Sequence, residues 1–518
     1  MGYQMNRRRF LQAAGVGVSL PFVSQLLAAC QAVAPGSGSS QPITEITWSR
    51  GDDLRTQDPQ LIAGRMEGEI NRAIYDQLFD IAPDGSQIPW LGQEWSSNSE
   101  GTVWTVQMHE GATFHDGSPV TADDVVFTYQ RLLDNPELQH AGSFIGLLGN
   151  VEAPDAGTVV FNCQQPAPLF NLLMGEHILS RKAFEDHGEN FWEQAIGSGP
   201  YRHLEYVVGE YWLGERFDDY WRPDVPQVNR LRYRPISEES TRIAALRTGE
   251  VDIIANISGE LAEELGADPN IVIHRTPSLD HLYLLTQSGR PPFDNPDARL
   301  AVNYAIDRQA LVENIVRAGQ TVGGHIPAGT VGYDASLEPF PYDPDEARRL
   351  LDQAGVAPGT VIEVKAHPFW FAKGREVMEY VAGALQDVGF EVDLQFLEPG
   401  AYTEARVSGN YDLALQQGNK SNNPCNQYKI FYVEDRYGTG HPGASPDLAQ
   451  AVEEACVTVE PELAEERFKA IQTRIYNESM EIQLYRQENI WAVRSRIQGF
   501  QAYSADSTRP WNGVSVSE

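Results

Sequence analysis

Cysteine and positive charge are both scarce in this chain. Its 518 residues include 4 cysteines, and 39 Lys and Arg stand against 72 Asp and Glu, which gives a net charge of −33. A field of that sign repels phosphate backbones and anionic lipid headgroups, so it excludes nucleic acid as an expected partner and favours a solvated acidic surface. The chain is nevertheless 42% hydrophobic. Its length and composition predict two or three domains with cores of their own.

The signatures of common enzyme classes are also missing. The sequence has no Gly-x-Ser-x-Gly elbow, no His-Glu-x-x-His, no Gly-Lys dipeptide to end a phosphate loop and no Cys-x-x-Cys pair. Residues 438–443 (GTGHPG) fit the letter of a dinucleotide pattern, but Pro442 stands where the first turn of the helix would run. His109 and His115 have no further His or Cys at ligand spacing. We therefore expect no catalytic residue, no cofactor and no structural metal site.

A convincing transmembrane run is absent as well. Residues 11–29 are apolar enough to raise that alternative, but they contain Pro21, two glycines, two serines and two glutamines. Such a segment is too weakly apolar to span a bilayer. No second long apolar run follows it.

The N-terminus instead has the form of an export signal. Residues 6–12 (NRRRFLQ) match a twin-arginine signal, and residues 27–30 (LAAC) match a lipobox, in which the Cys30 thiol receives the lipid. Residues 1–30 are therefore predicted to be a lipoprotein signal peptide. Residues 31–44 are rich in Gly, Ser and Pro and predict a flexible linker. The mature protein would be held by its lipid anchor alone, at the outer face of the cytoplasmic membrane or in the periplasm.

With Cys30 set aside, three cysteines remain: Cys163, Cys425 and Cys456. An exported chain can form disulfides, and three thiols allow one pair. Cys425 with Cys456 is the favoured pair because both lie in the C-terminal half and would close a loop of ordinary length. Three free buried thiols remain the alternative.

Strand and helix signals alternate along the chain from Trp48 onward, which predicts an α/β fold. Residues 104–108 alternate apolar and polar, and residues 121–124 (TADD) have capping-box spacing, so a strand and then a helix are expected there. Residues 361–396 carry the clearest signal, a strand, a helix that Gly389 ends, and a second strand. A crossover of this length requires parallel, right-handed pairing of its strands.

At this point the sequence resembles a known family, the extracellular solute-binding proteins of family 5, which serve dipeptide, oligopeptide and nickel import systems. The most specific match is residues 110–127 (EGATFHDGSPVTADDVVF), preceded by residues 89–95 and Trp104. Further matches follow in the order of the family, at residues 197–201 (GSGPY), 241–252, 292–294 (PFD), 305–308 (AIDR), 342–344 (YDP), 411–413 (YDL), 481–485 (EIQLY) and 499–500 (GF).

The resemblance implies a two-lobed periplasmic-binding-protein-like fold of type II, cluster C, with an additional small domain. Lobe I would comprise residues 45–75, 195–284 and 484–518, the additional domain residues 76–194, and lobe II residues 285–483. The hinge strands would pass near residues 283–287 and near Tyr485. Closure of two lobes around a ligand is a common form of hinge motion.

The implied function is that of a substrate-binding component of an ABC importer, not of an enzyme. Such a protein, expected to be a monomer, would capture a peptide or peptide-like solute and deliver it to the permease subunits. The alternatives are a receptor for an oligosaccharide, another polar non-peptide solute or a metal chelate, and an exported hydrolase.

The site residues follow partly from the family pattern. In its peptide-binding members, an aspartate after the YDL strand pairs with the amine of the ligand, because a buried ammonium needs such a partner. Asn423 stands at that place here, within residues 418–426 (GNKSNNPCN), and the departure leaves recognition of a free amine open. The candidate ligand-binding residues here are neutral amides: Gln287, Gln416, Gln417, Asn419, Asn422 and Asn423. The alternative is that these amides cap turns in an exposed loop.

Two further groups of residues are candidates. His367 and Trp370 follow the strand at 361–367, and aromatic rings in such clefts stack on sugars or clamp apolar side chains. They could equally support packing of the lobe. Arg50, Asp53 and Arg55 lie where the first strand would meet the cleft, although they could equally form a solvated run of charges.

Overall fold

The computed structural model describes residues 44–62, 64–223, 225–367, 373–419, 423–505, 509 and 511–517. The predicted twin-arginine signal, the lipobox with Cys30 and residues 31–43 of the linker lie outside the described residues, as do Trp370 and Asn422. Residues 44–518 form one compact unit by their contacts. Within the described residues, no helix is both long enough and apolar enough to span a bilayer.

The unit is built on a mixed sheet of ten strands in the order β14-β13-β15-β12-β16-β11-β1-β10-β9-β8. The strands of this sheet are β1 (Glu45–Arg50), β8 (Tyr201–Val207), β9 (Tyr211–Arg216), β10 (Arg230–Pro235), β11 (Ile253–Ala255), β12 (Ile271–Thr286), β13 (Val361–Ala366), β14 (Glu391–Phe396), β15 (Leu413–Asn419) and β16 (Glu481–Arg494).

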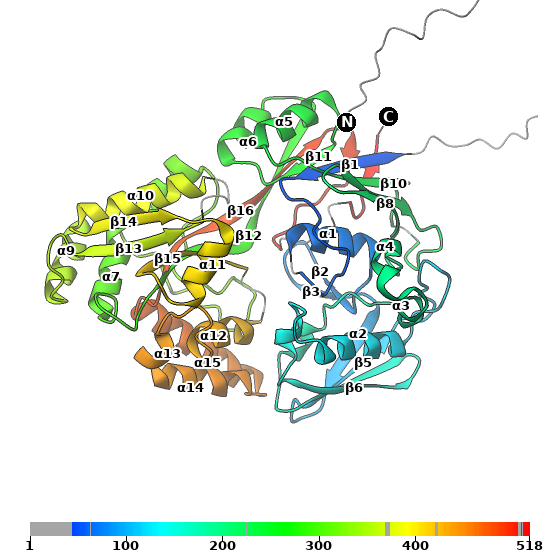
Figure 1. Ribbon diagram of the computed structural model, residues 1–518, viewed down its shortest axis with the longest axis horizontal. Coiled ribbons are helices and arrows are strands. Elements are labelled where there is room, and N and C mark those ends of the chain that lie inside the picture. Colours follow the sequence, from blue (N-terminus) through cyan, green and yellow to red (C-terminus); the bar gives the residue numbers. More distant parts are fainter. Residues whose placement is uncertain are drawn as a thin grey trace, which may run out of the picture. The chain divides into compact units, whose positions relative to one another are not determined.

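Two long neighbouring strands, β12 and β16, pass through the middle of this sheet (Figure 1). They pair antiparallel from end to end, with register shifts between Pro277 and His281 and between Leu282 and Tyr283. The N-terminal part of β12 pairs only with β16, whereas from Asp280 onward it pairs with β15 as well. The two halves of the sheet therefore meet at residues 278–280. The predicted hinge at residues 283–287 and the predicted start of lobe II at 285 lie at the end of β12 and just beyond it, and both stay predictions.

The strand–helix–strand unit predicted from residues 361–396 is present. β13 and β14 pair in parallel in an unbroken register from Val361 with Glu391 to Ala366 with Phe396. Helix α10 (Gly374–Asp387) connects them, and it buries the apolar face that includes Val377, Val381 and Leu385. The parallel pairing expected from the crossover length is confirmed.

A second sheet of four antiparallel strands has the order β4-β5-β7-β6, formed by β4 (Gly92–Ser97), β5 (Val103–Met108), β6 (Leu148–Asp155) and β7 (Thr158–Cys163). Helix α2 (Ala122–Asp134) begins with the predicted capping box: both the backbone N–H and the hydroxyl of Thr121 lie 2.9 Å from Oδ2 of Asp124. Two strand pairs complete the sheets, β2 (Phe79–Ile81) with β3 (Gln87–Pro89) and β17 (Ile497–Gln498) with β18 (Ser515–Val516).

The helices connect these strands and cover the sheets. Besides α2 and α10 they are α1 (Arg65–Ile74), α3 (Arg181–His187), α4 (Phe191–Gln194), α5 (Glu239–Thr248), α6 (Gly259–Leu265), α7 (Pro296–Ala305), α8 (Arg308–Ala310), α9 (Pro344–Gln353), α11 (Pro399–Val407), α12 (Pro424–Tyr432), α13 (His441–Ala444), α14 (Pro446–Cys456) and α15 (Pro461–Asn477). The 3-10 helices η1 (Ala141–Ser143), η2 (Phe170–Leu173) and η3 (Gly188–Asn190) and the π-helix η4 (Leu311–Val316) accompany them.

Separate hydrophobic cores follow the sheet organisation. One core is formed wholly by buried residues between Leu78 and Ile178 and packs around the four-stranded sheet. Another joins the beginning of the chain to its end, from Ile46 to Val514, and a third lies between Leu282 and Tyr485. A fourth core, under helices α12, α14 and α15, contains both Cys425 and Cys456. These two residues, the pair that the sequence favoured, are joined by a disulfide, and Cys163 on β7 lies outside it.

Candidate functional site

The parallel strands of both halves of the sheet run toward the crossing of β12 and β16. β15 is antiparallel to β12 and ends at Asn419, opposite Asp280, and β13 and β14 run the same way as β15. On the other side, β11 is antiparallel to β16 and advances from Val493 toward Trp491, and β1 and β10 run parallel to β11. Ligands of open α/β sheets bind outside the carboxyl ends of the strands. The topology therefore directs two sets of strand ends to one place.

A polar cluster of the buried Asp280 and the partly buried Gln417 and Gln487 lies at this crossing. The side-chain amide of Gln417 on β15 donates to Oδ2 of Asp280 on β12 at 3.0 Å and lies 3.0 Å from the amide oxygen of Gln487 on β16. The backbone N–H of Asp280 donates to Oγ of Ser278, also at 3.0 Å. Asp280 is 2% exposed. Since burying a carboxyl group is costly unless hydrogen bonds satisfy it, the hydrogen bond from Gln417 offsets part of the cost of burying Asp280 at the junction of three strands.

The backbone at the crossing is held from both sides. Gln320 and Arg486 exchange two backbone hydrogen bonds of 3.0 and 2.8 Å, and the Arg486 guanidinium donates to the carbonyl of Ser278. The backbone N–H of Leu279 donates to the carbonyl of Ser504 at 2.9 Å. At the register shift between Pro277 and His281, the carbonyl of Ser278 and the N–H of Leu279 thus have hydrogen-bond partners other than the backbone of β16.

The two neighbouring glutamines of β15 have different surroundings. Successive side chains of a strand point to opposite faces, and only Gln417 lies with Asp280 and Gln487. The amide of Gln416 instead accepts a hydrogen bond from Arg406 of α11 and donates to the carbonyl of Gln417 at 3.0 Å. Gln416 and Gln417, which the sequence analysis grouped as contacts of one pocket, therefore have hydrogen-bond partners on different sides of the strand.

Asn423 begins helix α12. Its amide oxygen accepts a hydrogen bond of 3.0 Å from the backbone N–H of Cys425, so the side chain is the N-cap of the helix. This is the capping role that the sequence left open as an alternative. For Asn419, whose backbone pairs with Asp280, only the main chain is described. A contact of Asn419 or Asn422 with a ligand stays a prediction.

Gln287 lies just beyond the end of β12, away from the crossing. Its amide nitrogen donates to the carbonyls of Gly409, at 3.2 Å, and of Gly438, while its oxygen accepts from the N–H of Gly289 at 2.9 Å. Three backbone groups of the protein thus already use this buried amide, and a contact of Gln287 with a ligand stays a prediction.

His367 directly follows β13, at the same edge of the sheet as the end of β15. It is 7% exposed, its ring lies 6.4 Å from that of Tyr402, and burial lowers its pKa. Its position fits either of the roles that the sequence allowed. Trp370, its predicted companion, lies outside the described residues.

The charged residues after β1 are tied into the protein. Arg50 forms a buried ion pair with Glu69 and donates to Oδ1 of Asn256 at 2.9 Å, so it links the carboxyl ends of β1 and β11. Asp53 accepts hydrogen bonds from the N–H groups of Leu54 and Gly209, both at 2.8 Å. Arg55 pairs with Glu67 through two hydrogen bonds. These contacts favour a structural role for this run of charges.

The other motifs of the sequence also have structural explanations. His115 lies 2.9 Å from the carbonyl of Gly199, and its ring accepts from the N–H of Gly197 at 3.2 Å. Across the described part of the chain, no three His, Cys, Asp or Glu side chains are grouped as metal ligands would be. In the GTGHPG segment, a Cβ on Gly440 would stand 2.5 Å from the nitrogen of Gly289, so close packing explains this glycine.

The sequence analysis missed Asp280 and Gln487. A signal for Asp280 was present: a carboxylate stands in the apolar run LDHLYLL at residues 279–285. Charged residues are rarely fully buried unless they are paired. An acidic residue within an apolar strand therefore indicates a specific partner or a role in a site. Nothing local marks Gln487, because its hydrogen-bond partner Gln417 belongs to another strand and lies 70 positions earlier in the chain.

Comparisons with known proteins agree with this architecture. A family model described as bacterial extracellular solute-binding proteins, family 5 Middle, matches residues 86–438. The glutathione-binding protein GsiB of Pectobacterium atrosepticum is 28% identical over 399 residues, which is 76% of this chain and 74% of that protein.

Solved structures show the same fold. The ABC transporter substrate-binding protein CtaP from Listeria monocytogenes has a TM-score of 0.83 at 24% identity and covers 92% of this chain and 100% of its own. The periplasmic binding protein DppA from Helicobacter pylori, in complex with the peptide STSA, has a TM-score of 0.77 at 21% identity, with 92% and 98% covered. The predicted α/β, two-lobed class of fold is confirmed.

Proposed function

Since the chain belongs to the bacterial extracellular solute-binding proteins of family 5, we propose that it captures a peptide or peptide-like solute and delivers it, chemically unchanged, to the permease of an ABC importer. The observation that carries this proposal is the convergence of the parallel strand ends on the crossing of β12 and β16. The names of similar proteins, one for glutathione and one solved with a peptide, support this ligand class.

The proposed ligand contacts follow from the chemistry at the crossing. Amide side chains donate and accept hydrogen bonds, as the backbone of a peptide does, and Gln417 and Gln487 lie together there beside Asp280. We keep Gln287, Asn419, Asn422, His367 and Trp370 as predicted contacts and leave out Gln416 and Asn423. No catalytic role is assigned to any of them.

The proposed motion is a hinge between two lobes. Lobe I would comprise residues 45–75, 195–284 and 484–518, with residues 76–194 as an additional domain, and lobe II would comprise residues 285–483. The separate cores support this division. Rotation about the β12–β16 crossing would close the lobes on the ligand, and the closed form would be the one that the permease recognises.

Export and anchoring complete the proposal. The family is extracellular or periplasmic. Residues 6–12 would direct the folded chain to the twin-arginine pathway, and Cys30 would carry the lipid of a monomeric mature protein. Mass spectrometry of the protein isolated from its membrane should find a lipid-modified Cys30 as the first residue. The Cys30→Ala variant should be found in the soluble fraction and not in the membrane fraction. An unmodified N-terminus before residue 30 would contradict the proposed anchoring.

Binding can be tested directly. The mature protein, denatured after purification, should release its ligand for mass spectrometry, and a panel of cysteine-free tri- and tetrapeptides should raise its Tm. A ligand at a hundred times its Kd adds about 2.7 kcal/mol to the free energy of unfolding. Stabilisation by oligosaccharides or metal chelates but by no peptide would overturn the ligand class. Recovery of cleaved peptides would overturn the assignment as a binding protein.

A further inference from the structure

The additional domain, residues 76–194, is joined to lobe I by buried hydrogen bonds. The side chain of Asp76 is fully buried and accepts hydrogen bonds from the hydroxyl of Tyr220 at 2.9 Å and from Nε1 of Trp221 at 3.0 Å. On another side of the domain, Nε2 of His115 lies 2.9 Å from the carbonyl of Gly199. Since these contacts cross from the additional domain to lobe I, the two should move together in a hinge motion.

One side chain of the additional domain packs instead on the core of lobe II. Ala167 and Phe170 belong to the core around the four-stranded sheet, whereas Leu169, between them, packs against the core under α12, α14 and α15. Leu173, at the end of η2, packs again on the core of its own domain. Leu169 therefore makes an apolar contact between the additional domain and lobe II.

A second contact with lobe II comes from the turn between β4 and β5. A Cβ on Gly101 in this turn would stand 2.8 Å from Cγ1 of Val459, in the connection between α14 and α15. The carbonyl of Gly101 accepts a hydrogen bond of 2.8 Å from the N–H of Ala167, which holds the turn beside the segment of Leu169. In Figure 1, α14 and β5 both lie below β12 and β16, so these contacts are made away from the crossing of the two strands.

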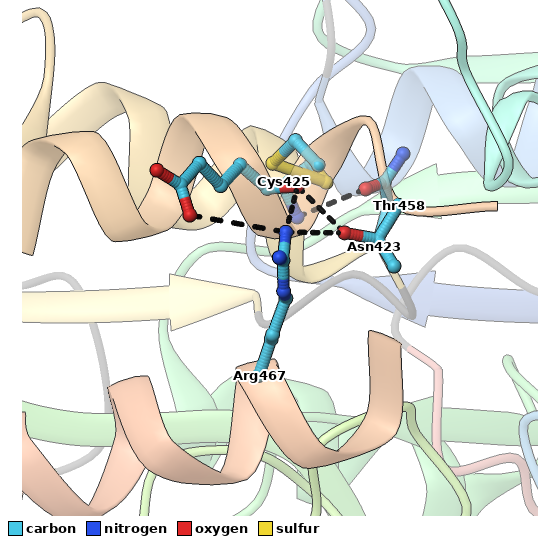
Figure 2. The surroundings of a disulfide bond; sticks show 6 residues. Asn423, Cys425, Thr458 and Arg467 are labelled. Atoms are coloured by element: carbon cyan, nitrogen blue, oxygen red, sulfur yellow. Dashed lines mark hydrogen bonds and ion pairs between the residues drawn. A yellow bond between two sulfur atoms is a disulfide. The ribbon is translucent and has the colours of Figure 1, made fainter. Parts of the chain in front are cut away.

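The connection that carries Val459 is held in place by its own surroundings. Cys456, the last residue of α14, is joined by the disulfide to Cys425 in the first turn of α12 (Figure 2). The guanidinium of Arg467 on α15 donates to the hydroxyl of Thr458 at 2.9 Å (Figure 2). Both sides of the contact are thus anchored within their own domains. A rotation of the lobes would therefore separate the two surfaces and not deform them.

We propose that the contacts of Gly101 with Val459 and of Leu169 with the core of lobe II form a clasp, by which the additional domain holds the lobes closed and slows the release of the ligand. This inference rests on the proposed function and gives the additional domain a role in it. Opening of the lobes would expose the apolar surface of the clasp to water, and this cost favours the closed form.

The first test measures how fast the peptide with the largest Tm shift in the panel dissociates. The protein is loaded with isotope-labelled peptide and mixed with an excess of unlabelled peptide, and the label still bound is followed with time by rapid filtration. Leu169→Ala should release the peptide about fivefold faster than the wild type, because the lost apolar contact stabilises only the closed form.

Leu173→Ala is the matched control for this variant. The same side chain is truncated, and it is also partly buried, but it packs on the core of its own domain. This variant should have a lower Tm and the dissociation rate of the wild type, at a temperature where all variants are folded. Equal acceleration by the two variants, or none by Leu169→Ala, would refute the clasp.

A covalent bond at the same place tests the geometry. Because Cγ1 of Val459 lies 2.8 Å from a Cβ at position 101, the Cβ atoms of two cysteines there would be within about 4.5 Å, the range of disulfides. Gly101→Cys/Val459→Cys, oxidised with labelled peptide bound, should keep the label, and a reductant should restore its release. Peptide mapping identifies the joined cysteines. Failure of these two cysteines to join in the folded variant, or release from the crosslinked protein at the rate of the wild type, would overturn the proposal.

X-ray scattering of the ligand-free proteins keeps this inference separate from the proposed ligand class. Without ligand, Leu169→Ala should have a larger radius of gyration than the crosslinked Gly101→Cys/Val459→Cys protein, because only the latter is held closed. Equal radii would overturn the clasp even if peptides bind. A wild type that binds no peptide would instead overturn the proposed function.

Discussion

Gln417 and Asp280 are joined by a hydrogen bond of 3.0 Å across neighbouring strands, at the place where the ten-stranded sheet changes from one half to the other. The two residues are far apart in the sequence, 137 positions from each other. The bond orients a buried carboxylate beside the ends of the parallel strands. The site predictions below start from this pair.

Replacing Gln417 by Ala should weaken ligand binding. The variant removes the amide proposed to bind the peptide, together with its hydrogen bonds to Asp280 and Gln487. One hydrogen bond to a ligand contributes about 1 kcal/mol, so we expect about fivefold loss of affinity for the best peptide of the panel. Isothermal titration calorimetry measures this directly.

The matched control for this variant is Gln107→Ala. Gln107 also stands in a strand, on the exposed face of β5, where its amide oxygen accepts only from the hydroxyl of Thr158. The Gln107→Ala variant should bind the peptide with the affinity of the wild type and have nearly the same Tm. Equal effects of the two variants would remove Gln417 from the proposed site.

His115 should make stability depend on pH. Burial lowers the pKa of His115 to about 4, against an ordinary value of 6.5. Between these two values the unfolded chain binds a proton that the folded chain does not, so the free energy of unfolding falls as the pH falls from 6.5 toward 4. The contribution amounts to about 2 kcal/mol between pH 7 and pH 5.

Urea unfolding of His115→Gln at both pH values tests this. The variant should be less stable than the wild type at pH 7, because its side chain cannot keep both contacts to the 197–199 segment, and the difference should narrow at pH 5. Other buried histidines, such as His203 with a pKa lowered to about 4, contribute equally to both proteins. Parallel stability curves would contradict the prediction.

Gly440 and Gly443 should respond differently to the same substitution. Gly440 has φ +71, and a Cβ there would lie 2.5 Å from the nitrogen of Gly289, so Gly440→Ala should cost about 2 kcal/mol or more. No atom lies within 4 Å of a Cβ on Gly443. Gly443→Ala should leave the Tm nearly unchanged. Similar melting temperatures for the two variants would show that packing does not explain the GTGHPG segment.

Much of the local structure could be predicted because its signals lie within a few residues. The capping box of Thr121 and Asp124 and the parallel unit from β13 to β14 both appear as expected. In each case the determining contact joins residues in one turn or in one strand–helix–strand unit.

The candidate site could be predicted only in part. The YDL strand ends at the crossing, and Gln417 lies near that end beside Asp280; its contact with a ligand stays a prediction. Gln287 and Gln416 were grouped with it on residue type alone, whereas register and strand face direct their amides to other partners. Asp280 and Gln487 were missed because strand register brings their side chains to Gln417, and register cannot be read from the neighbouring residues of the sequence.

The sequence by itself determined the α/β alternation, several helix ends and the resemblance of the motifs to one family. It also favoured Cys425 and Cys456 as the pair that could form a disulfide. Only the tertiary structure decided where the sheet changes from one half to the other, that Asp280, Gln417 and Gln487 meet, and that Asn423 caps a helix tied to α14. The physical reason is that helix ends and alternation depend on neighbours along the chain, whereas a shift of one residue in strand register moves every side chain to the opposite face.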